Sequence, residues 1–156
     1  MPYKNNFQFV DMRQQNRFIM IVDGLMSWHI RTSDLPNLEN NPVVVDTINA
    51  EYKIKGKSRW QDISVTLYDP IDISAAKMVH DWIKKHHNSD SNDDGRMSDY
   101  KKDITLMYVD PKGAPVEAWK LHGAFFASVN WGSVDVSSDD LLIIEGTISY
   151  DWAEIQ

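Results

Sequence analysis

The chain has 156 residues, of which 16 are Lys or Arg and 23 are Asp or Glu, so its formal net charge at pH 7 is −7 with neutral His. It contains no cysteine, which excludes disulfide frameworks, thiolate zinc sites and cysteine nucleophiles. An acidic chain also lacks the clustered cations that binding to a phosphate backbone requires. At 18.0 kDa we expect one domain, residues 17–156, preceded by a polar amino-terminal arm, residues 1–16.

The first apolar run covers residues 17–22 and reads RFIMIV, with apolar side chains on both faces of the expected strand. Such a strand is buried on both sides, or its second face meets another chain. Phe18, Met20 and Val22 are therefore candidates for an inter-subunit strand. A second strand is expected over residues 27–35, and the NLENNP sequence of residues 37–42 predicts a loop.

A long β-hairpin is expected between Ile48 and Leu67. Apolar and polar residues alternate over residues 48–55 and again over residues 62–68, around a short turn at Gly56. Four cations gather near the expected hairpin tip: Lys53, Lys55, Lys57 and Arg59. These residues are candidates for a contact between copies of the chain in a head-to-tail assembly.

One helix is expected, beginning after Asp72 or Ser74 as N-cap, because Ala75, Val79 and Trp82 recur at helical spacing. Residues 88–99 are expected to form a polar loop. Further strands are expected over residues 104–109, 116–126, 129–136 and 142–151. About eight strands and one amphipathic helix predict a mainly β fold, a β-barrel or sandwich with one flanking helix.

Metal and catalytic motifs are incomplete in this sequence. Residues 90–95 read DSNDDG, the first half of a calcium loop, but Lys101 stands where the loop needs a bidentate carboxylate. The five histidines supply no set of three ligands in register, and neither a serine-nucleophile elbow nor a phosphate-binding glycine loop is present. We therefore expect no metal, no cofactor and no enzymatic activity. No run of apolar residues approaches the length of a membrane span, so no membrane partner is expected.

The charges are unevenly distributed along the chain. No Lys or Arg follows Lys120, whereas Asp135, Asp139 and Asp140 lie beyond it. Two interpretations remain open. The acidic and basic stretches are ordinary solvated faces, or they are complementary surfaces in a head-to-tail assembly, with the three aspartates as partners of the basic hairpin. The six tryptophans exceed what a domain of this size readily buries, which favours an oligomer interface.

Several stretches, in this order and spacing, resemble the tail tube proteins of contractile-tailed, T4-like bacteriophages. The matching stretches are residues 17–25 (RFIMIVDGL), 32–36 (TSDLP), 60–69 (WQDISVTLYD), 100–103 (YKKD), 116–126 (VEAWKLHGAFF) and 145–152 (EGTISYDW). The resemblance extends from about Arg17 to Trp152. It departs at Phe126, where the family often has Pro.

This resemblance implies a β-barrel-like sandwich with a flanking helix, six copies to a ring, and rings stacked into a hollow tube. It also implies contact with sheath and baseplate proteins, passage of genome DNA through the lumen without specific binding, and a place in the virion tail after assembly in the bacterial host cytoplasm. A net acidic subunit agrees with such a conduit, because negative walls do not retain phosphate.

Three alternatives remain open. Within the same architecture, the chain is a tube initiator at the baseplate, or the inner-tube protein of a contractile bacteriocin or type VI secretion system. In a different class, it is a monomeric β-barrel module that binds a small ligand. An enzyme is the third reading.

Overall fold

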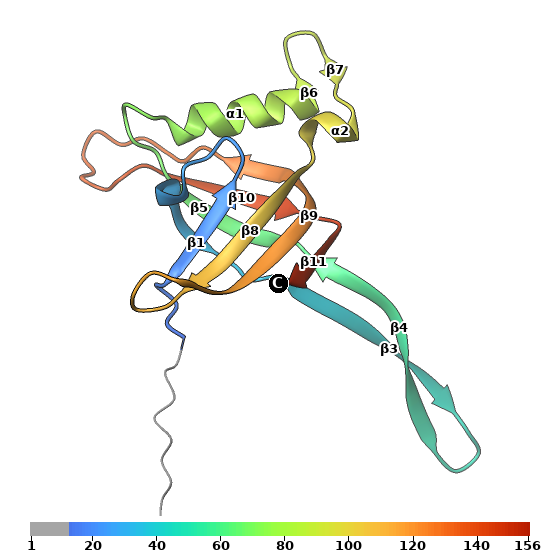
Figure 1. The fold of residues 1–156 in the computed structure, drawn as a ribbon. Coiled ribbons are helices and arrows are strands. Elements are labelled where there is room, and N and C mark those ends of the chain that lie inside the picture. Colours follow the sequence, from blue (N-terminus) through green and yellow to red (C-terminus); the bar gives the residue numbers. More distant parts are fainter. Residues whose placement is uncertain (1–12) are drawn as a thin grey trace, which may run out of the picture.

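The computed structural model describes residues 13–156, so the expected amino-terminal arm lies outside the described residues except for its last four. The domain is built on a seven-stranded antiparallel sheet in which the order is β1-β8-β9-β10-β5-β2 and β11 pairs with β9 (Figure 1). The strands are β1 (Phe18–Val22), β2 (Ile30–Ser33), β5 (Ile63–Tyr68), β8 (Lys102–Val109), β9 (Pro115–Asn130), β10 (Ile143–Ser149) and β11 (Trp152–Ile155). This is the expected mainly β architecture.

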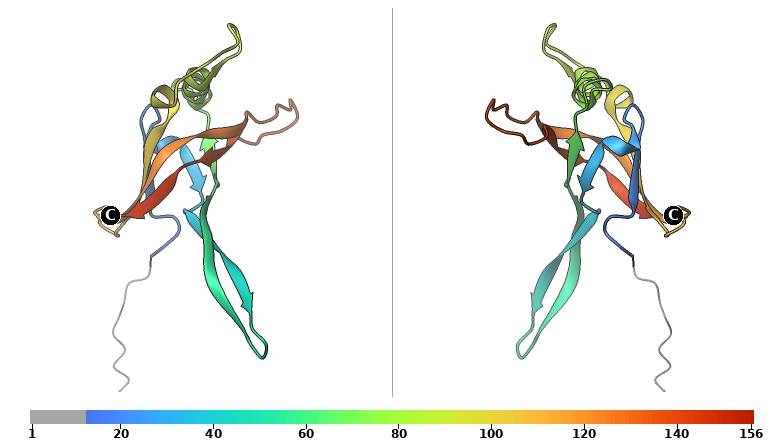
Figure 2. Two further views of the ribbon diagram at one scale, coloured as in Figure 1. Left: turned by 90° about the vertical axis from the view of Figure 1, so that its right-hand side faces the viewer. Right: turned by 90° about the vertical axis from the view of Figure 1, so that its left-hand side faces the viewer.

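Strand β9 links the two parts of the sheet. Its first part pairs with β8 on one edge, while β11 and then β10 pair in succession along the other edge. Gly123 lies where β9 bends and has a φ of +66°, which favours glycine. A Cβ there would lie 2.2 Å from Oδ2 of Asp151. The bend curves the sheet around its apolar face, as the views in Figure 2 show.

The core lies between the curved sheet and helix α1 (Ala75–His86). The helix begins at the expected N-cap, where Ser74 Oγ accepts a hydrogen bond from Lys77 N at 3.2 Å. Trp82 is buried, and its Nε1 donates to the Tyr100 carbonyl at 2.6 Å. Alternate side chains of the strands supply most of the remaining core: Ile63, Val65, Leu67, Ile104, Leu106, Leu121, Ile144 and Ile148. The predicted apolar stripe of the helix is confirmed.

The long hairpin exists, but the residue ranges predicted for its strands and its turn are wrong. The hairpin consists of β3 (Asn37–Asp46) and β4 (Glu51–Gln61), which form a separate two-stranded sheet that projects from the domain (Figure 1). The turn is at residues 47–50, where Thr47 N donates to Ala50 O at 2.7 Å. Residues 37–42 are therefore strand rather than loop, and β5 belongs to the main sheet.

Gly56 explains the error. It lies in the middle of β4, opposite a register shift between Asn40 and Pro42 in β3. A Cβ at Gly56 would lie 2.2 Å from the Asn41 carbonyl oxygen, so glycine is needed for close approach of the two strands. A polar segment can pair in such a ribbon because its strand hydrogen bonds involve only the backbone.

Two other expected strands differ from the structure. Residues 27–29 form a single 3₁₀ turn, η1 (Ser27–His29), rather than the start of a strand, because His29 is buried and bonds back to Met26. Residues 131–142 form a loop between β9 and β10, although Val134 and Val136 alternate with polar residues. Both valines are almost fully exposed, since no strand of the described residues covers them. The expected polar loop at residues 88–99 contains the short elements β6 (His87–Asn88), β7 (Asp93–Asp94) and α2 (Met97–Tyr100).

Candidate assembly surfaces

The β3–β4 hairpin, called the arm below, has an apolar face. Cross-strand partners share a face, and Val43 pairs with Ile54 while Val45 pairs with Tyr52. Val43, Ile54 and Tyr52 are 48%, 49% and 55% exposed. Beyond the register shift the apolar face comprises Val43, Val45, Tyr52 and Ile54, whereas Leu38 and its partner Trp60 lie on the other face near the root of the arm. Neither strand of the arm pairs with a strand of the main sheet, so most of this face has no partner within the described subunit.

The four predicted cations of the arm do not share one face. Lys53 and Lys55 pair with Val44 and Pro42, on the side away from Ile54. Arg59 pairs with Glu39, on the same side as Ile54, because β4 has one more residue than β3 at the register shift. Their expected place at the hairpin tip is wrong, because the tip is at residues 47–50 and holds the fully exposed Ile48. The four side chains, called the basic row below, therefore follow β4 but are divided between the two faces of the arm. Their role in a contact between rings stays a prediction.

The three predicted aspartates lie in the loop of residues 131–142, called the acidic loop below. Asp135, Asp139 and Asp140 are exposed. The backbone N–H and the hydroxyl of Ser137 both donate to Asp135 Oδ1, at 2.9 and 2.8 Å, and these bonds lower the pKa of Asp135. Between this loop and the sheet lies a hollow of about 970 Å³, whose lining includes Arg31 and Tyr68.

The predicted inter-subunit strand is β1, an edge strand that pairs with β8. Met20 and Val22 are only 2% and 4% exposed, and Phe18 packs against the same core. The alternation of β1 points Met20 and Val22 into their own subunit, so these two side chains are not themselves available to a neighbour. The outer face of β1 instead presents Ile21, which is 50% exposed. The role of β1 between subunits stays a prediction that rests on Ile21 and on the backbone edge of β1 that pairs with no other strand of residues 13–156.

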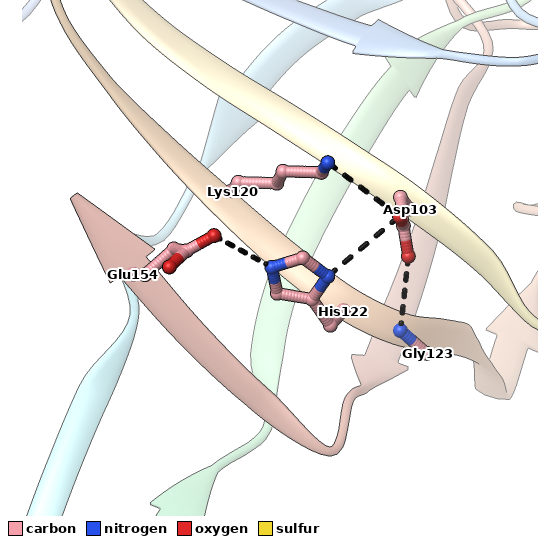
Figure 3. Close-up of polar contacts among 5 residues, drawn as sticks. All are labelled: Asp103, Lys120, His122, Gly123 and Glu154. Carbon is pink, nitrogen blue, oxygen red and sulfur yellow. Dashed lines mark hydrogen bonds and ion pairs between the residues drawn. The ribbon is translucent and has the colours of Figure 1, made fainter. Parts of the chain in front are cut away.

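A polar cluster joins three neighbouring strands on the outside of the domain (Figure 3). His122 of β9 lies between Glu154 of β11, with Nε2 3.0 Å from Oε1, and Asp103 of β8, with Nδ1 3.6 Å from Oδ2. Lys120 Nζ is 3.8 Å from the same Asp103 oxygen, and Gly123 N donates to Oδ1 at 3.4 Å. Both ring nitrogens of His122 face carboxylates, so the cluster fastens β11 to β9 and β8.

The half calcium loop folds as a small hairpin. His87 Nδ1 lies 2.7 Å from Asp94 Oδ1 across the β6–β7 pair, and Asn92 occupies the turn with a φ of 58°. Within residues 13–156, no group of three or more His, Asp or Glu side chains is arranged to hold a metal ion. No helix of the same residues is long and apolar enough to cross a membrane.

A curved antiparallel sheet with one flanking helix and a projecting hairpin is the fold of tube proteins from contractile injection systems. No protein-family model matches the chain, and no curated protein matches its sequence. Solved structures do match. A chain from the PVC extracellular contractile injection system, in the structure of its sheath/tube terminator, has a TM-score of 0.78 and 20% identity over 96% of this chain and 99% of that chain.

Two more solved structures share the fold over nearly the whole chain. A chain from the tube-terminating cap of the anti-feeding prophage has a TM-score of 0.78 at 19% identity, covering 100% of this chain and 99% of that chain. A chain from the PVC sheath–tube complex has a TM-score of 0.74 at 22% identity, covering 93% of this chain and 91% of that chain. These neighbours come from terminator, cap and sheath–tube assemblies. The resemblance to tail tube proteins is confirmed at the level of the fold.

Proposed function

We propose that this chain is a structural tube subunit, in which hexameric rings stack into the hollow conduit of a contractile bacteriophage tail. The observation that carries the proposal is the arm, whose apolar face has no strand partner among residues 13–156 outside the arm itself. A two-stranded hairpin is marginally stable by itself in water. An exposed apolar ribbon on a tube-protein fold is therefore best explained by a second copy that covers it.

The contact between rings is head-to-tail. Such a heterologous contact repeats without closing, as a growing tube requires. The basic row of Lys53, Lys55, Lys57 and Arg59 and the acidic loop with Asp135, Asp139 and Asp140 have opposite charges. Charge complementarity of this kind governs encounter and register more than affinity. Within a ring, a neighbour contacts Ile21 and the edge of β1 that no strand of the described residues covers.

In this role the tube contacts a surrounding sheath and a baseplate, and genome DNA passes through the lumen without specific binding. The net charge of −7 supports such a conduit, because acidic walls repel the phosphate backbone. The subunit then belongs to the virion tail and assembles in the host cytoplasm. The inner tube of a phage-derived injection machine serves the same function as a conduit, with a different cargo.

A second candidate function is the terminator ring that closes such a tube. The observation in its favour is the TM-score of 0.78 with chains from two structures of terminator or cap assemblies, compared with 0.74 for the sheath–tube complex. A terminator forms one ring at a tube end and does not polymerise further. The tube initiator at a baseplate is the corresponding ring at the other end.

Negative-stain electron microscopy and sedimentation velocity of the purified full chain test the proposal. Stacked rings that lengthen with protein concentration are expected for the main tube subunit. Single rings that do not lengthen would assign the chain to a terminator or an initiator instead. A sharp 18.0 kDa monomer at every concentration and salt tested would overturn both functions and favour the monomeric binding module.

A further inference from the structure

We propose that the hollow between α1 and residues 126–131, called the side groove below, binds an extended acidic segment of a partner protein, which adds to the sheet as one more strand. The side groove has a volume of about 500 Å³, and its walls come from α1, the β6–β7 hairpin and the end of β9. It is separate from the arm and from the three aspartates of the acidic loop. This inference therefore goes beyond the proposed tube function.

One wall of the side groove is an unpaired strand edge. Strand β9 pairs with β8 only as far as Ala124, whereas its pairing with β10 on the other edge continues to Asn130. Residues 125–130 therefore have one edge that no strand among residues 13–156 covers. Four consecutive residues of this stretch, 126–129, line the side groove. The unpaired N–H and C=O groups of such an edge are a template for a further strand.

The second wall is α1, which passes beside this edge (Figure 1). Two contacts between rings mark its course. The ring centroid of His80 lies 6.1 Å from that of Trp131, and the ring centroid of His86 lies 5.7 Å from that of Phe125. The helix and the strand therefore run past each other in opposite directions. PDZ and PTB domains bind extended peptides at an exposed sheet edge by strand addition, and the side groove offers the same kind of edge.

Both ends of the side groove are held in place by the fold. At one end Trp131 is followed by Gly132, whose φ of 92° turns the chain sharply. At the other end the β6–β7 hairpin closes on the last turn of α1, where Gly95 N donates to His86 O at 2.8 Å. A Cβ at Gly95 would collide with the Lys85 carbonyl oxygen, so this close approach needs glycine. A preformed groove of this kind has little conformational freedom to lose on binding.

The charges of the side groove match an acidic occupant. Its titratable lining residues are Lys84, three histidines and a single carboxylate, Asp90. His87 is already engaged, because its Nδ1 lies 2.7 Å from Asp94 Oδ1, whereas Lys84 is exposed. Trp131, which is 39% exposed, adds apolar surface at one end. Alternate side chains of a strand share a face, so a segment that alternates carboxylates with apolar residues suits both the cations and the tryptophan.

Fluorescence anisotropy of two short labelled peptides with the full chain tests the charge match. One peptide alternates Glu and Val, and the other alternates Lys and Val. We expect the Glu–Val peptide to bind at least about tenfold more tightly than the Lys–Val peptide. Lys84→Glu should weaken binding of the Glu–Val peptide by about tenfold. The matched control Lys77→Glu, on the same helix but outside the side groove, should leave that binding unchanged. Equal binding of the two peptides, or no binding of either, overturns the inference.

Backbone methylation of the Glu–Val peptide tests strand addition itself, because it removes N–H donors and keeps the charge. Methyl groups on the Glu nitrogens or on the Val nitrogens block opposite edges of an added strand. We expect one of the two methylated peptides to lose at least about tenfold in affinity and the other to retain most of it. Amide hydrogen exchange of residues 125–130 should also slow in the complex. Equal effects of the two methylations, or unchanged exchange, overturn strand addition.

A second copy of the chain is the competing occupant of the side groove. If another copy covers it, the Glu–Val peptide bound by dispersed subunits is displaced as rings form, and this result overturns a partner protein as the occupant. Equal binding by dispersed and assembled chains supports the inference. Both results leave the tube function standing. A chain that binds the peptide but never assembles would overturn the tube function and retain the side groove as a peptide site.

Discussion

Trp60, near the end of β4, packs against Tyr150, which lies between β10 and β11. Their ring centroids are 6.0 Å apart and the ring planes are inclined by 54°. Tyr150 is only 7% exposed and belongs to the core, so this contact ties the root of the arm to the interior of the domain. The direction in which the arm leaves is therefore set by core packing as well as by the chain connection to β5.

Tyr150→Phe should not destabilise the subunit. The Tyr150 hydroxyl is buried, and although the Asn37 backbone is near enough to act on its pKa, no hydrogen bond of ordinary geometry reaches it among the described residues. Removing an unsatisfied buried polar group is nearly neutral or stabilising, so we expect the free energy of unfolding to stay the same or rise by up to about 1 kcal/mol. Urea denaturation at neutral pH measures this. Tyr150→Ala is the control, and it should cost about 3 kcal/mol or more because it leaves a cavity beside Trp60.

The same variant should change the response to alkaline pH. Burial raises the pKa of Tyr150, so the folded state holds the phenolic proton more tightly than the unfolded chain. This contribution to stability is present below the unfolded pKa of about 10 and is lost as the pH rises through the folded pKa. Between about pH 8 and pH 11, wild type should therefore lose more unfolding free energy than Tyr150→Phe. Equal losses would contradict this assignment.

Gly56→Ala should damage the arm and spare the domain. Its Cβ would clash with the Asn41 carbonyl oxygen, so the two strands must separate, at a cost to the arm of about 1–3 kcal/mol. We expect faster proteolysis within residues 37–61 and slower tube growth, with an unchanged melting temperature for the main domain. The exposed turn substitution Asn49→Ala is the control. Unchanged proteolysis of the arm would contradict the bulge as described.

The helix and most of the main-sheet strands could be predicted from the sequence because their side chains alternate between a core and solvent. Val65, Leu67, Ile104 and Ile148 each have such a pattern around them. The arm could not be placed correctly, because the alternation over residues 48–55 does not show on which side the turn lies, and a glycine at a bulge looks like one at a turn. The sequence also did not predict that the buried His29 bonds to Met26 and Ile73 and so connects η1 to the loop before α1. A histidine beside apolar residues was the only signal in the sequence.

His29→Ala should destabilise the subunit. It removes a fully buried ring and leaves Met26 N and Ile73 O without their hydrogen bonds. The combined loss is expected to cost about 2–4 kcal/mol in urea denaturation. The exposed His80 supplies the control, since His80→Ala should change stability by less than about 0.5 kcal/mol. Equal effects of the two variants would mean that η1 is held by other contacts.

The two faces of β1 should respond differently to substitution. Met20→Ala removes a core side chain and should lower the unfolding free energy by about 2–5 kcal/mol. Ile21→Ser lies on the outer face and should change it by less than about 0.5 kcal/mol. Sedimentation velocity should nevertheless show weaker ring formation for Ile21→Ser. Rings as stable as those of wild type would remove β1 from the interface between subunits.

Assembled protein should not bind duplex DNA at physiological ionic strength. The subunit is net acidic, and its basic row is covered in the proposed stack. Fluorescence anisotropy with a labelled duplex should therefore show no binding to tubes. The arm variant with glutamates at positions 53, 55 and 57 is the control for residual cations. Micromolar, salt-sensitive binding to assembled tubes would mean that the cations face the lumen.

The arm leaves the domain on one side only, and this gives any assembly built through it a direction. At one end of such a filament every subunit presents a bare hairpin, and at the other end every subunit presents an empty receiving surface. The two ends are therefore chemically different objects with different growth rates. A partner that starts the filament needs only one of these two surfaces, and a partner that stops it needs only the other.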